Sequence, residues 1–141
     1  MLPEQNKRVL GEYFGKQADV VAAFLFGSAA RGDFGPGSDV DIAVLLDRVA
    51  TPAPLRAATL ASEAMTLLGR PDVDVVVLNK ATPLLRHRVA RDGEVLFARS
   101  NTDVAEFVIR AIHGFVDTQP LRDLQRQQLQ QRIRDNLAPP T

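Results

Sequence analysis

The sequence contains no cysteine, and this absence limits the kinds of site that it can build. Without thiols the 141-residue chain has neither a disulfide framework nor a thiolate metal site. A cysteine-free composition is compatible with a reducing, intracellular compartment.

The sequence also lacks an excess of charge of either sign. Lys and Arg together number 17, and Asp and Glu together number 17, so the formal net charge is zero. A protein whose main role is to coat a nucleic-acid backbone normally carries a clear positive excess. We therefore expect no strong nucleic-acid binding, although a local basic patch remains compatible with this balance.

Long apolar runs are absent as well. No run approaches the roughly 18 apolar residues of a membrane-spanning helix, and the opening residues MLPEQNKRVL carry no apolar core of signal-peptide length. We expect a cytoplasmic protein without a membrane association. With 45% hydrophobic and 24% charged residues, the composition is that of an ordinary globular domain.

The apolar residues that are present predict alternating helices and strands. We expect Thr51 to cap one helix and Gly69 to end it, and we expect Thr82-Pro83 to start another. The fold class is therefore α/β, a small mixed sheet flanked by helices, with a core over residues 1–99. Residues 100–141 form a C-terminal helical extension, with two helices and a short tail, of the same domain. The expected strands span 19–28, 39–46, 72–78 and 94–98, and the expected helices before the extension span 3–16, 51–69 and the segment from Thr82.

The last predicted helix, LRDLQRQQLQQRIRDNL over residues 121–137, is rich in Gln and Arg and has few apolar residues. A helix of this composition buries little surface against its own domain. Either it frays, or something outside the chain covers it.

Two aspartates, Asp39 and Asp41, stand at the start of the apolar strand DVDIAVLL. In a strand, residues i and i+2 point to the same face, so both carboxylates project together and repel. A hard divalent cation such as Mg²⁺ removes this repulsion, because it prefers carboxylate, water and phosphate oxygens as ligands. The alternative is that both are strand-entry caps facing solvent.

A Gly-Ser pair, Gly27 and Ser28, ends the preceding strand. Gly27 lets a phosphate approach the backbone, while Ser28 offers a hydroxyl where a short helix can present free N–H groups. If the two strands run antiparallel, this turn lies beside the two aspartates and outlines a nucleotide site. Arg31 is a candidate bidentate phosphate ligand, with a surface ion pair to Asp33 as the alternative.

A third carboxylate would complete a two-metal site. The segment PDVDVVVLN offers Asp72 and Asp74. Asp74 lies inside the valine run, where a charge without a partner is costly, whereas Asp72 follows Pro71 and suits a turn. We favour Asp74.

This pattern resembles the nucleotidyltransferases of the DNA polymerase β superfamily. Gly27 and Ser28, then ten residues, then Asp39-Val40-Asp41 and the later Asp74 fill the signature of that superfamily. The segments AARGDFGPGSDVDIAVLL and VDVVVLN, with LLRHRVARDGEVLF after them, are similar to minimal nucleotidyltransferases, in particular MntA-type antitoxins of HEPN/MNT toxin–antitoxin pairs.

The resemblance implies a Mg²⁺-dependent transfer of AMP from ATP to a tyrosine hydroxyl of a partner HEPN ribonuclease toxin, which neutralises the toxin in a hetero-oligomer. It implies two Mg²⁺ ions held by Asp39 and Asp41, with Asp74 completing the site and helping to deprotonate the acceptor. Phosphate binding falls to Ser28 and nearby N–H groups. The alternatives are an antitoxin that only masks its partner by binding, or a nucleotidyltransferase acting on a small molecule or RNA.

Three further residues are candidates for functional roles. His87, between Arg86 and Arg88, is expected on a solvated helix face, although such a basic cluster could also meet a nucleotide or a partner. His113 is expected to be structural. Tyr13, the only tyrosine, could accept AMP in self-modification, but its place in a helical apolar stripe favours burial.

Overall fold

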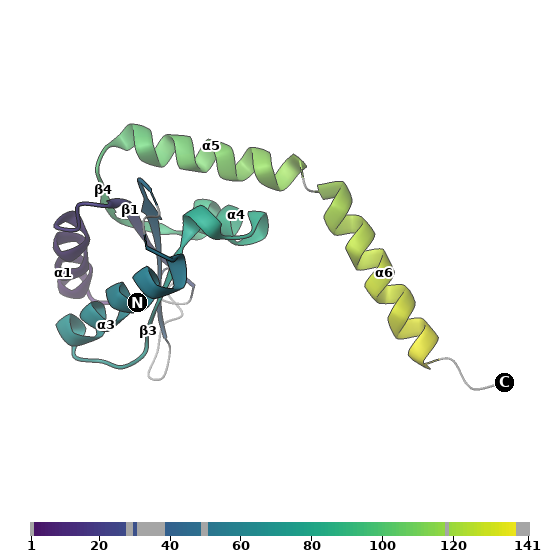
Figure 1. Ribbon diagram of the computed structural model, residues 1–141, viewed down its shortest axis with the longest axis horizontal. Coiled ribbons are helices and arrows are strands. Elements are labelled where there is room, and N and C mark those ends of the chain that lie inside the picture. The colour runs from purple at the N-terminus through teal and green to yellow at the C-terminus, as the bar shows by residue number, and fades with distance from the viewer. Residues whose placement is uncertain (1, 28–29, 31–38, 49–50, 118, 138–141) are drawn as a thin grey trace.

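A computed structural model describes residues 2–27, 30, 39–48, 51–117 and 119–137 (Figure 1). Ser28, Arg31 and the short tail after residue 137 therefore lie outside the described residues. The elements are α1 (Glu4–Gly15), β1 (Val20–Phe26), β2 (Val40–Leu46), α3 (Ala53–Leu68), β3 (Val73–Val77), the 3₁₀ turn η1 (Leu78–Lys80), α4 (Pro83–Asp92), β4 (Glu94–Ala98), α5 (Asn101–Asp117) and α6 (Gln119–Leu137).

The strands form one mixed sheet, which confirms the predicted fold class. Four strands lie in the order β3-β2-β1-β4. Strand β1 runs antiparallel to both β2 and β4, whereas β2 and β3 are parallel and are joined through α3. A helical crossover is the usual way to connect two parallel neighbours.

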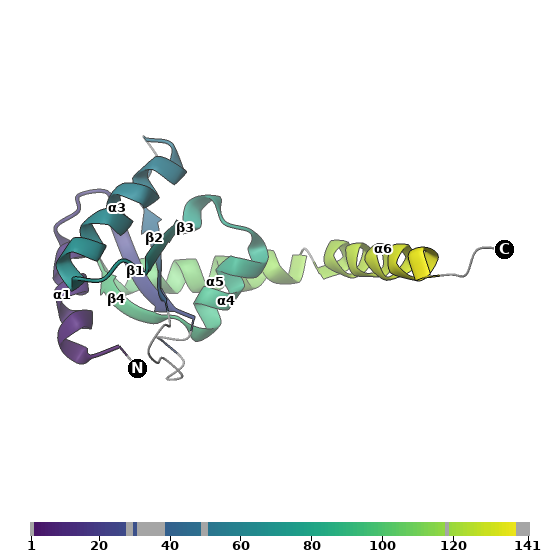
Figure 2. The ribbon, with the colours of Figure 1, turned by 90° about the horizontal axis from the view of Figure 1, so that it is seen from below.

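Helices cover both faces of the sheet (Figure 2). On one face, Leu25 and Ile42 pack in a cluster against α1 and α3. Leu10 of α1 and Leu60 of α3 belong to the same cluster. On the other face, alternate residues such as Phe24 pack in a second cluster with α4 and α5. The two-residue period of a strand explains this division, because neighbouring side chains point to opposite faces.

The ends of α3 and α4 show which predicted helix signals operate. Gly69 adopts φ +65° and its N–H donates to the carbonyl of Met65, so it ends α3 as expected. The side chain of Thr82 accepts a hydrogen bond from the Leu85 N–H and caps α4. The prediction for Thr51 is wrong: Pro52 occupies the N-cap position of α3, and no side chain caps it.

Helix α6 extends away from the rest of the molecule (Figures 1 and 2). Every side chain from Leu124 to Asp135 is exposed. The segment does not fray: it is helical over its full predicted length. The rest of the described chain does not cover it. Among the described helices, none combines the length and the apolar content needed to cross a membrane.

Candidate active site

Three neighbouring strands bring Gly27, Asp41 and Asp74 to one end of the sheet. Phe26, the last residue of β1, lies opposite Asp41 in the antiparallel pair, and Asp41 lies beside Asp74 in the parallel pair. Adjacent strands are about 4.8 Å apart, so the backbones of the two aspartates are close neighbours. The antiparallel arrangement that the nucleotide-site interpretation requires is therefore present.

Asp41 and Asp74 belong to the sheet face that carries α4 and α5. Strand alternation places Asp41 on the side of Ala43, which packs in the second cluster, while Val40 is buried on the other side. Asp41 is half-buried, Asp74 is exposed, and Asp39, one residue before β2, is exposed. The carboxylates thus stand where the apolar cluster gives way to solvent.

Gly27 is fitted closely against Asp41. It adopts φ +70°, a conformation that other L-residues rarely adopt. A Cβ built on Gly27 would lie 2.6 Å from Oδ2 of Asp41, closer than real contacts allow. The Gly27 carbonyl also accepts a hydrogen bond from the Ala30 N–H at 3.2 Å, which turns the chain directly after β1. The absence of a side chain at position 27 therefore preserves the space that Asp41 occupies.

Asp72 and Asp74 differ in their surroundings. The Asp72 carboxylate accepts two hydrogen bonds from Arg70, at 2.5 Å from Nε and 2.6 Å from Nη2, and this guanidinium lowers the pKa of Asp72. The Asp72 carbonyl accepts from the Val40 N–H at 2.8 Å, joining the starts of β2 and β3. Asp72 is thus a structural residue of the turn, as its place beside Pro71 indicates.

The argument that burial makes the Asp74 charge costly is wrong, because the Asp74 side chain is exposed. The reason to favour Asp74 is its register beside Asp41. The sequence alone does not reveal the role of Arg70. The pKa of Arg70 is raised mainly by its hydrogen bonds to Asp72, and the nearby charge of Asp39 adds to this effect. The nearness of Arg70 to Asp39 follows from strand pairing, which the linear sequence does not display.

The donor set suits a hard cation that is shared with a phosphate-bearing substrate. Within the described ranges, no three carboxylate or imidazole groups lie close enough together to hold a metal ion by themselves. Mg²⁺ usually takes only one or two protein carboxylates, and water and phosphate oxygens complete its octahedron. Asp41, with Asp39 two residues before it and Asp74 beside it, fits that requirement.

Tyr13 lies on the opposite face of the sheet, in the contact between α1 and α3. It packs against the first cluster, and its hydroxyl donates a 2.5 Å hydrogen bond to Glu63 Oε2. Burial and this carboxylate raise the pKa of Tyr13. Its half-buried position agrees with the expected burial, and it is badly placed to accept a group at Asp41.

The predictions for the two histidines are wrong. His87 is half-buried, and its ring stacks on Phe115 of α5 with centroids 3.9 Å apart and planes 16° apart. Arg86 is also half-buried, and its guanidinium lies 5.7 Å from the Phe107 ring centroid. His113, expected to be structural, is exposed. The spacing along each helix does not reveal how α4 and α5 pack together.

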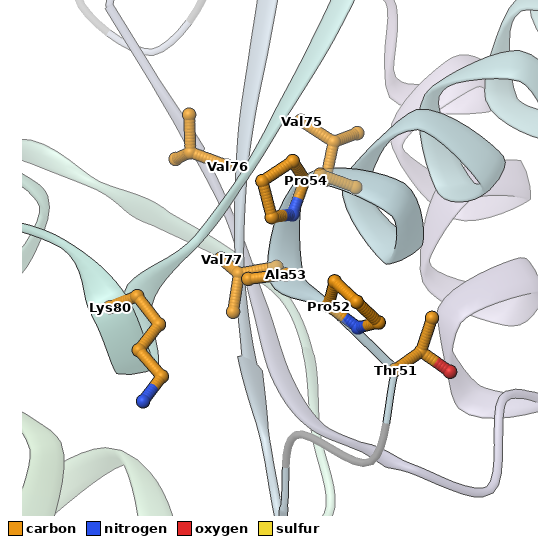
Figure 3. A pocket seen from close by; sticks show the side chains of 9 residues that line it. Thr51, Pro52, Ala53, Pro54, Val75, Val76, Val77 and Lys80 are labelled. Carbon is orange, nitrogen blue, oxygen red and sulfur yellow. The ribbon is translucent and has the colours of Figure 1, made fainter.

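A separate groove lies along β3, which forms one edge of the described sheet (Figure 3). It has a volume of about 640 Å³ and an apolar lining that includes Pro52, Pro54 and Val77, with Lys80 at its rim. Because it follows the later part of β3, it is distinct from the end where Asp74 meets Asp41.

Comparisons with known proteins agree with this geometry. Residues 9–102 match the family model described as Polymerase beta, Nucleotidyltransferase. A relative, the protein adenylyltransferase MntA of Aphanizomenon flos-aquae (strain 2012/KM1/D3), is 34% identical over 95 residues, which are 62% of this chain and 63% of the relative. The chain thus matches somewhat less than two thirds of that relative's length.

Two solved structures are similar over nearly the whole chain. A chain of a toxin–antitoxin crystal structure with AMP-PNP superposes with a TM-score of 0.76 at 26% identity, covering 91% of this chain and 99% of that one. A chain from a complex of tri-AMPylated Shewanella oneidensis HEPN toxin with MNT antitoxin gives a TM-score of 0.71 at 23% identity, covering 90% and 98%, and shares the fold. Because the family model spans well over half of the sequence and the sheet carries its aspartates in register, the chain belongs to the polymerase β nucleotidyltransferase family.

Proposed function

We propose that this protein transfers AMP from ATP to a tyrosine hydroxyl of a partner HEPN-type ribonuclease toxin and thereby acts as its antitoxin. The observation that carries the proposal is the register that sets Asp41 beside Asp74 and opposite Phe26, with Gly27 directly after it. The 26% identity with a chain of the toxin–antitoxin structure containing AMP-PNP supports the choice of nucleotide and of partner class.

Each site residue has a distinct role in this proposal. Gly27, Ser28 and Arg31 bind the triphosphate, while Asp39 and Asp41 hold Mg²⁺, two ions in all, with Asp74 as the third carboxylate. When bound, Mg²⁺ neutralises phosphate charge in the transition state. Because Gly27 has no side chain, the backbone after β1 can lie directly against the Asp41 carboxylate.

The reaction is a displacement at the α-phosphorus of ATP. The tyrosine oxygen forms a bond to this phosphorus, the bond to the oxygen bridging the α- and β-phosphates breaks, and pyrophosphate leaves. The Asp74 carboxylate accepts the tyrosine proton. Positioning and charge neutralisation supply most of the rate enhancement in such phosphoryl-type transfers.

The acceptor has to come from another molecule. Tyr13 is the only tyrosine in the chain. It lies on the face opposite Asp41 and is bonded to Glu63. A tyrosine on a partner chain is limited neither by the position of Tyr13 on the far face of the sheet nor by its hydrogen bond to Glu63.

The test is label transfer from ATP labelled at its α-phosphate to the proposed HEPN-type partner, in the presence of Mg²⁺. We expect transfer by the wild-type protein and none by the Asp39→Asn, Asp41→Asn double variant. Ribonuclease activity of the partner is measured in the same samples. If the double variant transfers no label and still neutralises the ribonuclease fully, masking by binding replaces catalysis as the mechanism.

A further inference from the structure

Most of the exposed large apolar side chains of the described residues lie on α5 and α6. On α5, Ile112 is 45% exposed and Val116 is 61% exposed; on α6, Leu129 is 57% exposed and Ile133 is 48% exposed. Ile109, Leu121 and Leu124 add to the same set. Soluble proteins seldom leave so much apolar surface on adjoining elements unless another molecule covers it.

The row on α5 is separate from the face that α5 buries. Phe107 and Ala111 pack in the core cluster, whereas Ile109, Ile112 and Val116 follow one another at spacings of three and four residues on another face. This helix is therefore apolar on two sides, and its own domain covers one of them.

The base of α6 is fixed to the body by a stack of three side chains. Phe115 of α5 lies between the His87 ring of α4, 3.9 Å away, and the Arg122 guanidinium of α6, 3.6 Å from the ring centroid. Arg122 also donates a 2.6 Å hydrogen bond to Gln119 Oε1 within α6. The stack directs α6 outward, so that beyond Leu124 the helix is surrounded by solvent (Figure 1). A single helix of this length is only marginally stable in water without packing.

The charge on α6 is mainly positive. It carries four arginines, Arg122, Arg126, Arg132 and Arg134, against two aspartates, Asp123 and Asp135. A surface that covers its apolar side chains and also complements this charge is apolar in the middle and acidic at the rim.

Part of the outward helix aligns with a chain of a solved toxin–antitoxin structure. The matched chain with AMP-PNP covers 91% of this chain, and the part left unmatched is shorter than the 19 residues of α6. At least part of α6 is therefore aligned with that chain.

We propose that α6, together with the exposed row of α5, is the arm by which this protein docks its partner toxin. This inference rests on the partner proposed above. The occupant is a helical face of the toxin, apolar at its centre and acidic at its edge, and docking through the arm holds the acceptor tyrosine within reach of Asp41 and Asp74.

The test compares two double variants of the full chain. Leu129→Glu with Ile133→Glu places charge at the apolar pair in the outer half of α6. Gln127→Glu with Gln131→Glu adds the same charge at the same spacing on the side opposite this pair. Binding to the toxin is measured by isothermal titration calorimetry, and AMP transfer is measured by label incorporation. Circular dichroism of the free variants checks that both keep the helix content of the wild type.

We expect the first pair to weaken toxin binding by about 30-fold or more, as the loss of central apolar contacts does in other interfaces, and the second pair to change binding by less than about threefold. Equal binding by both pairs overturns the proposal. The proposal is also overturned if sedimentation shows that the first pair dissociates a homodimer of this chain while toxin binding is unchanged. If the complex forms and the first pair breaks it, but no AMP is transferred by the wild type, docking stands and the transferase proposal fails.

Discussion

At the scale of single residues, Gly27 lies directly against the Asp41 carboxylate at the end of β1. Both Gly27 and Gly69 have positive φ, at +70° and +65°, but a Cβ meets Asp41 Oδ2 at 2.6 Å only at Gly27, while nothing lies within 4 Å at Gly69. A substitution at Gly69 therefore introduces backbone strain alone, whereas one at Gly27 introduces the same strain and also displaces the Asp41 carboxylate.

We predict that Gly27→Ala and Gly69→Ala each lower the free energy of unfolding by about 1–2 kcal/mol, since both place a side chain in the left-handed region. Only Gly27→Ala is expected to reduce AMP transfer strongly, by about 100-fold or more, because the carboxylate has to move. Urea denaturation and label transfer measure the two effects. Full transfer activity in Gly27→Ala contradicts the role assigned to this contact.

Asp74 and Asp72 provide a second comparison of neighbours. Asp74 lies in register with Asp41, whereas Asp72 is paired with Arg70. We expect Asp74→Asn to lower kcat at least about 100-fold, because it removes the proposed proton acceptor. Asp72→Asn should leave kcat within about threefold and reduce stability slightly, since the Arg70 pair is partly exposed. The reverse ranking would assign the third carboxylate to Asp72.

At the scale of elements, an ion pair fastens α3 to the start of β1. Arg56 Nε and Nη2 donate to Asp19 at 2.8 Å and 2.7 Å, and Arg56 also donates to Gln17. The Arg56 hydrogen bonds lower the pKa of Asp19 below its usual value, against the opposing effect of burial. The folded state therefore binds fewer protons at this site than the unfolded state just below the usual aspartate pKa.

This stabilisation is complete above the unfolded-state pKa and is lost as the pH falls through the lower folded-state pKa. We predict that Arg56→Gln costs about 1 kcal/mol in unfolding free energy at neutral pH, and that the difference from wild type shrinks between about pH 4 and pH 2. Urea denaturation at a series of pH values measures it, with the exposed Arg110→Gln as control. A difference that grows toward acid pH has the wrong sign for this account.

The elements also show what a linear sequence reveals. The runs VVAAFLF and VDIAVLL predict strands β1 and β2, because strands covered on both faces are mostly apolar. Gly69 and Thr82 mark helix ends by local chemistry. Thr51 has the same capping chemistry, but Pro52 occupies the cap position instead. The sequence does not show the stacking of His87 on Phe115, because Phe115 lies on another helix.

At the scale of the whole molecule, the candidate site depends on pairings between distant segments. Asp39 and Asp41 stand out in the sequence, yet the position of Asp74 beside Asp41 exists only because α3 returns the chain parallel to β2. The exposure of Asp74 and the nearness of Arg70 to Asp39 arise from the same packing. Residue types and spacing thus predict the chemistry of the site, while strand register determines its geometry.

The two proposals concern two separate parts of the molecule, the compact sheet and the extended helix α6. The sheet end carries Gly27, Asp41 and Asp74, and α6 reaches outward from the α4–α5 layer that covers the same sheet face (Figure 2). Both proposals together require a partner that lies along α6 and also reaches the sheet end that carries Asp41 and Asp74.

The most direct test of the central claim is intact-mass spectrometry of the proposed HEPN-type partner after incubation with this chain, ATP and Mg²⁺. The account predicts a gain of one or more whole AMP units, located on tyrosine by fragmentation and absent when the Asp39→Asn, Asp41→Asn variant replaces the wild type. An unchanged mass, with a stable complex and a neutralised ribonuclease, would contradict AMP transfer to this partner.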